Sequence, residues 1–231
     1  MLSQHFKRVL FSLIAVMFLA VPWAGSHAHL ILTLTDKDTG ISVTVEDLDG
    51  DGIVSFNGGI AGTVWGANLT GGFSKPLLGS PYTSVIDLVS ANLTTSGAGE
   101  LEIMLTDDNF DTPLGPSRYL AAVGGTTQGT VSFQSYIDYA NLHFGTGTLL
   151  QDTGEMGGLA FSDTAGGSVN PVSPYSLTLV ATIKQEARKI TSFDYMVQVP
   201  EPASLALLGV GLLALGGFAS VATRRKGALQ A

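Results

Sequence analysis

The chain contains no cysteine among its 231 residues. A protein without cysteine has no disulfide, no thiol nucleophile and no thiolate ligand for a metal ion. Its stability must therefore come from the burial of apolar side chains or from bound ions. This absence is compatible with an oxidising compartment and does not by itself indicate one.

Basic residues are scarce where a folded domain is expected. Of the 11 lysines and arginines, five lie close to the two ends of the chain. Residues 29–199 therefore hold 6 basic and 18 acidic residues, a formal charge of −12 (6 minus 18). Such a charge repels the phosphates of nucleic acids and anionic membrane surfaces. We expect no nucleic acid partner, whereas a cation or a neutral polysaccharide is compatible with this charge.

Histidine is also rare, and of the four in the chain only His29 and His143 follow the first 28 residues. A Ser-His-Asp triad would need one of these two, and no G-x-S-x-G nucleophile turn occurs. The many carboxylates single out no pair for glycosidase chemistry. The sequence therefore predicts a protein that is not an enzyme.

Apolar and polar residues alternate with a period of two over much of residues 29–199, and helical periodicity is missing there. The positions that share one face of an alternating run include Val43, Val45, Leu101, Ile103, Leu105, Val131, Phe133, Leu177, Leu179 and Ile183. A segment of this length is enough for one core but short for two. We predict a single all-β domain, an antiparallel β-sandwich, over residues 29–199.

Glycine-rich segments are interpreted as connections between these strands. Gly71-Gly72 and Gly124-Gly125 are typical of turns. The interval 145–174, rich in glycine, serine and threonine, predicts a long loop or a disordered surface segment. The acidic cluster of Asp107, Asp108 and Asp111 is expected to be a solvated turn, with a set of metal ligands as the alternative.

The first 28 residues have the organisation of a secretory signal peptide. Lys7 and Arg8 precede a run from Val9 to Val21 that is apolar except for Ser12, and Ser26-His27-Ala28 offers small residues at the cleavage positions. We expect export and removal of residues 1–28, with an uncleaved anchor as the alternative.

The other end of the chain combines three features in order. Pro200-Glu201-Pro202 displays one carboxylate on extended backbone, because both prolines are unfavourable inside a helix. Residues 203–222 hold only apolar, glycine and serine side chains and are long enough for a transmembrane helix. Arg224-Arg225-Lys226 then place the end of the chain in the cytoplasm. This order over residues 200–226 resembles the PEP-CTERM tail of Gram-negative bacteria.

In that family the tail is recognised by exosortase, a membrane enzyme that resembles a transpeptidase. The resemblance implies that exosortase is a partner and that the chain is held transiently in the inner membrane by one helix. Processing at the motif would then deliver the domain to the cell surface or release it. We expect a structural or binding role linked to exopolysaccharide.

One acidic motif allows two interpretations. Asp47, Asp49, Asp51 and Gly52 match positions one, three, five and six of an EF-hand calcium loop, but position twelve is Gly58 instead of glutamate. A hairpin turn rich in Asp-Gly pairs is the first interpretation. A weak calcium site is the second, and it would make the domain a calcium-dependent carbohydrate-binding module.

The two remaining histidines give an enzymatic alternative. Cleavage after Ala28 would make His29 the first residue, and its amine and imidazole together with His143 resemble the copper histidine brace of lytic polysaccharide oxygenases and copper carriers. Nitrogen ligands of this kind suit Cu(II). The simpler interpretation is a histidine that happens to follow the signal peptide.

Overall fold

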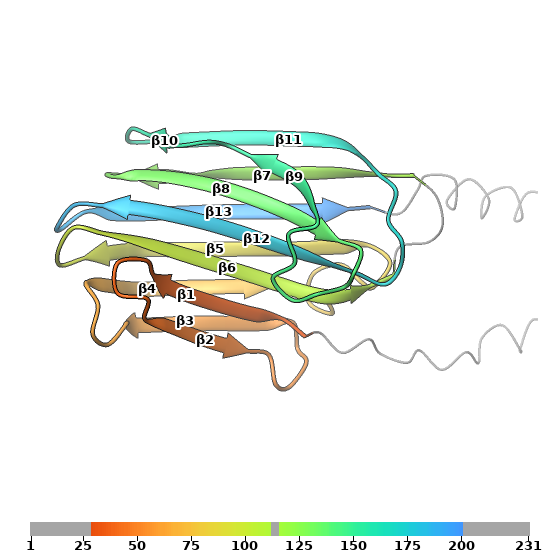
Figure 1. Cartoon of the computed structure of the whole chain (residues 1–231), viewed down its shortest axis with the longest axis horizontal. Coiled ribbons are helices and arrows are strands. Elements are labelled where there is room, and N and C mark those ends of the chain that lie inside the picture. The colour runs from red at the N-terminus through yellow and green to blue at the C-terminus, as the bar shows by residue number, and fades with distance from the viewer. Residues whose placement is uncertain (1–28, 112–115, 201–231) are drawn as a thin grey trace, which may run out of the picture.

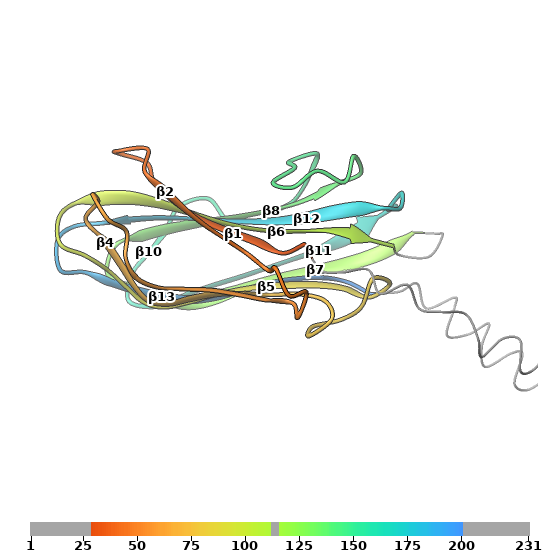
Figure 2. The ribbon, with the colours of Figure 1, turned by 90° about the horizontal axis from the view of Figure 1, so that it is seen from below.

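The computed structural model describes residues 29–111 and 116–200, which form a sandwich of two antiparallel sheets (Figure 1). The seven-stranded sheet has the spatial order β10 (Met156–Gly157), β8 (Thr130–Asp138), β12 (Tyr175–Gln185), β6 (Gly99–Phe110), β1 (Ile31–Asp36) and β2 (Ser42–Glu46), and β9 (Thr148–Asp152) also pairs with β8. The six-stranded sheet has the order β11 (Phe161–Val169), β7 (Ser117–Thr127), β13 (Ile190–Val199), β5 (Ser84–Thr95), β4 (Trp65–Phe73) and β3 (Ile53–Gly59). Seen edge-on, the two sheets form two layers (Figure 2). The predicted all-β sandwich is confirmed.

The alternating positions build the core between the sheets, as the sequence predicts. The buried residues include Leu101, Ile103, Leu105, Val131, Phe133, Leu177, Leu179 and Ile183. Phe133 lies among aromatic rings of the opposite sheet, with centroids 5.0 Å from Phe193 and 5.3 Å from Tyr195. Burial of each such side chain contributes about 1.5–3 kcal/mol. These contacts join the two sheets into one domain.

Both Gly-Gly pairs that were predicted as turns lie inside strands instead. Gly71-Gly72 belong to β4 and Gly124-Gly125 belong to β7. A methyl group on Gly72 would lie 2.2 Å from Leu105 Cδ1, and one on Gly125 would lie 2.3 Å from the carbonyl oxygen of Ser192. Glycine is required at position 125 because backbone atoms come too close for any side chain, whereas at position 72 the side chain of Leu105 would have to move.

The predicted loop over residues 145–174 is also wrong, because it contains β9, β10 and β11. β11 alternates between half-buried and exposed residues along most of its length, and it pairs with β7 at the edge of the six-stranded sheet. Its small side chains gave no apolar alternation to recognise. Pairing with a neighbouring strand, rather than intrinsic propensity, explains this strand.

Candidate functional site

Three residues from distant parts of the sequence meet at one end of the seven-stranded sheet. His29 precedes β1, Asp108 lies near the end of β6, and His143 follows β8. Asp108 Oδ2 lies 3.1 Å from His143 Nε2 and 4.0 Å from His29 Nδ1. The two imidazole rings are in edge-to-face contact, with centroids 4.5 Å apart. We call these three residues the histidine–aspartate cluster.

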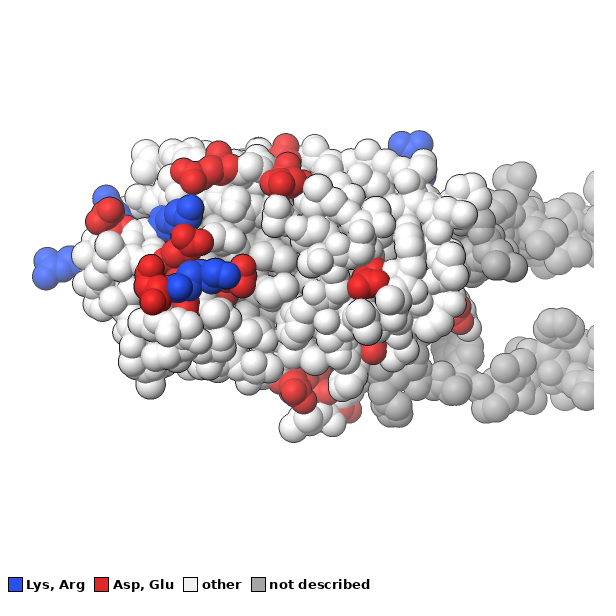
Figure 3. All heavy atoms as spheres, in the orientation of Figure 1, with Lys and Arg blue, Asp and Glu red and all other residues white. Residues whose placement is uncertain are grey.

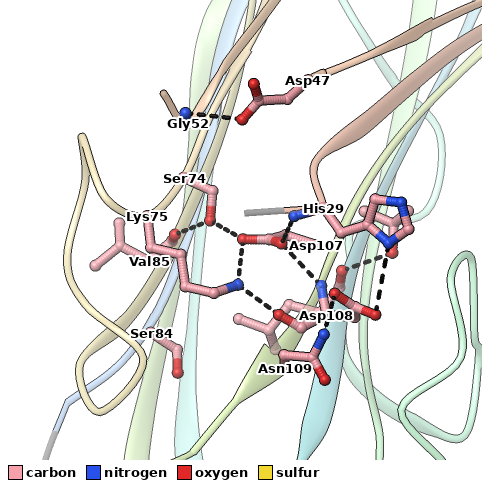
Figure 4. Close-up of polar contacts among 12 residues, drawn as sticks. His29, Asp47, Gly52, Ser74, Lys75, Ser84, Val85, Asp107, Asp108 and Asn109 are labelled. Atoms are coloured by element: carbon pink, nitrogen blue, oxygen red, sulfur yellow. Dashed lines mark hydrogen bonds and ion pairs between the residues drawn. The ribbon is translucent and has the colours of Figure 1, made fainter. Parts of the chain in front are cut away.

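Strand register explains why His29 reaches Asp108. β1 and β6 are antiparallel, with Ile31 opposite Thr106, so the residues that extend β1 toward the N-terminus run beside the end of β6. The nitrogen of His29 donates a hydrogen bond to Asp107 Oδ1 at 3.2 Å (Figure 4). The position of His29 is thus fixed by the sheet.

The segment that carries His143 is clamped over the same strand ends. The amide of Phe144 donates to Thr106 Oγ1 at 3.1 Å, and Ser176 Oγ donates to the carbonyl of Leu142 at 2.7 Å. A second clamp joins Asn109 and Asn141, whose two hydrogen bonds measure 2.9 and 3.0 Å. These contacts hold His143 against β6 without any regular structure.

Beneath the cluster lies a buried ion pair. Lys75 Nζ lies 2.7 Å from Asp107 Oδ2, and the two side chains are 1% and 0% exposed. Ser74 Oγ donates to the same carboxylate oxygen at 2.5 Å, and Lys75 Nζ also donates to the carbonyl of Asp108 (Figure 4). Burial lowers the pKa of Lys75, and the neighbouring Asp107 opposes that shift.

This arrangement corrects the expectation of a solvated turn at Asp107, Asp108 and Asp111. Asp107 and Asp108 lie in β6 and are buried, and only Asp111 is exposed. Asp107 has the same parity as the inward residues Leu101 to Leu105. This parity could have predicted a buried ion pair from the sequence, because a carboxylate in an inward position requires a buried cation. Sequence reasoning missed that cation, Lys75.

Negative side chains outnumber positive lysine side chains around Asp108. One lysine, Lys75, faces the two carboxylates of Asp107 and Asp108. Asp108 Oδ1 accepts a hydrogen bond from the side-chain nitrogen Nδ2 of Asn109 at 2.9 Å, so Oδ2 is the oxygen that faces the imidazoles. Nε2 of His143 is buried and has no hydrogen-bond partner among the described residues. This nitrogen lies 3.1 Å from Asp108 Oδ2 without forming a hydrogen bond, so we interpret the contact as electrostatic.

The predicted calcium motif is a turn whose first carboxylate is occupied by its own backbone. Oδ1 of Asp47 accepts hydrogen bonds from the amides of Gly50 and Asp51 at 2.8 and 3.3 Å. Oδ2 accepts one from Gly52 at 2.8 Å. One ligand atom from each of Asp47, Asp49 and Asp51 nevertheless lies within 4.8 Å of the others. The turn joins β2 to β3, which belong to different sheets, so the hairpin interpretation is wrong.

The sorting residues lie at the limit of the described chain. Pro200 follows β13 and is exposed. Glu201, Pro202, the expected membrane helix 203–222 and the basic residues Arg224-Arg225-Lys226 lie outside the described residues, as does the expected signal peptide 1–28. Within residues 29–111 and 116–200, no helix is long and apolar enough to cross a membrane.

Residues 198–226 match the family described as the PEP-CTERM protein-sorting motif. The chain therefore carries a PEP-CTERM sorting motif, as the sequence predicts. The motif implies export, processing by an exosortase and sorting to the cell surface. No curated protein matches the sequence.

Several solved structures align with the sandwich at low similarity. TmCBM61 in complex with β-1,4-galactotriose is 10% identical with a TM-score of 0.31, covering 62% of this chain and 92% of that one. The K1 cleaved adhesin domain of Lys-gingipain from Porphyromonas gingivalis W83 is 9% identical with a TM-score of 0.31, covering 65% and 91%. The CBM22-1 xylan-binding domain of Paenibacillus barcinonensis Xyn10C is 11% identical with a TM-score of 0.30, covering 65% and 94%. What this chain binds is therefore inferred from its own residues.

Proposed function

We propose that this chain is an exported surface protein whose β-sandwich is a structural or binding component of an exopolysaccharide matrix. The observation that carries the proposal is the sorting motif at residues 198–226. In this proposal the tail anchors the chain transiently in the inner membrane with its C-terminus in the cytoplasm, and exosortase then frees the domain. The domain itself has no catalytic activity.

The outer face of the seven-stranded sheet supports a neutral polymer as the ligand. Its β1–β2 edge displays paired hydroxyl groups, with Thr33 Oγ1 3.2 Å from Thr44 Oγ1 and Thr35 Oγ1 2.9 Å from Ser42 Oγ. Charged side chains gather toward one end of this face, and most of the remaining surface is uncharged (Figure 3). Hydroxyl groups can exchange hydrogen bonds with sugar hydroxyls without the desolvation cost of a charge.

Fractionation of the producing bacterium tests the sorting step. We expect the wild-type chain at the cell surface with the segment after the motif removed, and Glu201→Ala as full-length protein in the inner membrane. Glu186→Ala, which removes an exposed carboxylate from the domain, is the matched control and should be sorted normally. A mature surface protein that still carries residues 203–231 in mass spectrometry would show that the tail is a permanent anchor.

Binding to polysaccharide is tested by cosedimentation of the exported protein with exopolysaccharide from the same bacterium. A charge at the hydroxyl edge, Thr44→Glu, should weaken retention. Ser168→Glu places the same charge on exposed β11 of the other sheet and should leave retention unchanged. Equal retention of both variants and wild type would contradict a ligand on this face.

A calcium-dependent carbohydrate-binding module is the alternative, favoured by the proximity of the carboxylates of Asp47, Asp49 and Asp51. Calcium would have to displace backbone amides from Asp47, because both oxygens of that residue accept hydrogen bonds. A calcium-induced rise in melting temperature that Asp49→Ala removes would support this alternative, since a ligand bound only to the folded state stabilises it.

A further inference from the structure

We propose that His29, Asp108 and His143 bind one divalent transition-metal ion, with Cu(II) held more tightly than Zn(II). The site is independent of the sorting tail and of the hydroxyl face. It combines two imidazole nitrogens with one carboxylate oxygen, a ligand set typical of transition-metal sites in proteins.

The distances fit a single ion. Two ligands that each lie 2.0–2.1 Å from one metal ion are at most about 4.2 Å apart. Asp108 Oδ2 is 3.1 Å from His143 Nε2 and 4.0 Å from His29 Nδ1, so both of these pairs already satisfy that limit. All three ligand atoms lie within 4.8 Å of one another. Rotation of the exposed His29 ring would bring the third pair, the two imidazole nitrogens, within the same limit.

The charge at the cluster also calls for a cation. Lys75 is paired with Asp107, which leaves Asp108 without a lysine or arginine in ion-pair contact among the described residues. Its side chain is 11% exposed, so little water reaches it. A partly buried carboxylate of this kind is stabilised by a nearby positive charge. A metal ion held between Asp108 and the two rings supplies that charge.

A third observation points to a ligand at His143. Its Nε2 is buried, has no hydrogen-bond partner among the described residues and lies beside Asp108 Oδ2. A buried polar atom that makes no hydrogen bond is unfavourable in the folded state. Coordination would satisfy this nitrogen, and the clamp on residues 141–144 already holds it in place.

The proposed site differs from a brace built on the amino-terminal nitrogen. The nitrogen of His29 donates to Asp107, while its ring faces Asp108. The structure therefore offers Asp108 as the third ligand in place of an amine. His29 is 56% exposed, so water can occupy the remaining coordination positions. Copper is favoured over zinc because Cu(II) stands at the top of the affinity order for nitrogen and oxygen ligands.

The test uses the exported protein, purified from its bacterium with its own termini and stripped of metal by a chelator. Calorimetric titration should give one bound Cu(II) per chain and a weaker interaction with Zn(II). Electron paramagnetic resonance should show two coupled imidazole nitrogens. His143→Ala should weaken Cu(II) binding by about 100-fold or more, because loss of a direct ligand exceeds the 10–100-fold effect of an outer partner.

Asp108→Asn and Asp111→Asn form the matched pair of variants. Each removes one carboxylate from the same short segment, but only Asp108 contacts the histidines. We expect at least tenfold weaker Cu(II) binding for Asp108→Asn and no change for Asp111→Asn. If Asp108→Asn fails to fold, His143→Gln replaces it, with the loss of one coupled nitrogen as the readout.

Three results would overturn the proposal. The first is an equal loss of binding in Asp108→Asn and Asp111→Asn, which would indicate nonspecific attraction to acidic residues. The second is unchanged Cu(II) binding in His143→Ala, which would indicate capture by the amino terminus and His29 alone. The third is the absence of stoichiometric binding by wild type.

Discussion

Among the described residues, the turn at Asp47–Gly52 and the histidine–aspartate cluster are the two candidate ion sites, and they differ in which of their polar atoms already have hydrogen-bond partners. In the turn, three backbone amides occupy both oxygens of Asp47. In the cluster, Nε2 of His143 is buried without a hydrogen-bond partner among the described residues. In the motif that the sequence reveals, the carboxylate of Asp47 already has hydrogen-bond partners within the turn. In the cluster that the fold assembles, the imidazole nitrogen Nε2 of His143 still lacks one.

The two regions are also held in place by different interactions. The turn is fixed by local backbone geometry, since Gly52 has a φ of +83° and lies against the backbone of Ser74 and Lys75. The cluster rests on a buried ion pair that joins Lys75 after β4 to Asp107 in β6. One added methyl group at Gly52 can perturb the turn, whereas the buried ion pair is lost when either charged side chain is replaced.

Removing the buried cation should have the largest effect on stability. Lys75→Met leaves Asp107 charged and buried, so we expect a loss of about 3–5 kcal/mol in the free energy of unfolding. Lys37→Met is the control, because its pair with Glu102 is exposed and should contribute at most about 1 kcal/mol. Urea denaturation of both variants measures the difference. Similar losses would show that the buried pair does not support the cluster.

The sequence predicted the sandwich because burial follows strand parity, as the inward residues Leu101, Ile103 and Leu105 show. It did not predict β11, whose small residues depend on pairing with β7. Asp47 was found because its ligand spacing is local, but Asp108 and His143 are brought together only by strand register and by the clamp between Asn109 and Asn141. The copper prediction named both histidines without their carboxylate.

A methyl group added at Gly52 should destabilise the protein more than one added at Gly40, which lies in another turn. In Gly52→Ala the new Cβ would lie 2.5 Å from the carbonyl oxygen of Ser74, in addition to the unfavourable positive φ. We expect a loss of about 3 kcal/mol, the upper part of the range for local strain. Gly40→Ala shares a positive φ but has no atom within 4 Å, and should cost about 1 kcal/mol. Thermal unfolding of the two variants decides whether close packing at Gly52 fixes the turn.

A pair of acidic residues that the fold brings together predicts a smaller effect on stability, one that depends on pH. Asp87 in β5 and Asp194 in β13 are neighbours on the outer face of the six-stranded sheet, because β5 pairs with β13. Burial and then the charge of Asp194 raise the pKa of Asp87 to about 7 from 3.8. The folded state therefore binds a proton that the unfolded state lacks between about pH 4 and pH 7, and stability should fall as pH rises through that window.

Replacing this carboxylate tests the sign of the effect. Asp87→Asn should raise the melting temperature at pH 8 and reduce its fall between pH 5 and pH 8. Asp163→Asn changes one carboxylate in β11 and should leave the pH dependence as in wild type. A variant Asp87→Asn with an unchanged pH profile would contradict a shared proton at this pair.

Calcium should produce the smallest effect, and it tests the comparison between the two ion sites directly. Because both oxygens of Asp47 already accept backbone amides, calcium would have to break those hydrogen bonds before it could bind. The missing bidentate glutamate at Gly58 removes the ligand that would offset that loss. We therefore expect millimolar calcium to leave the melting temperature unchanged in wild type and in Asp49→Ala alike. A rise in the melting temperature of wild type that Asp49→Ala abolishes would mean that the turn can open for an ion although its own amides already bond to Asp47. Existing hydrogen bonds would then not explain why one candidate site binds an ion and the other does not.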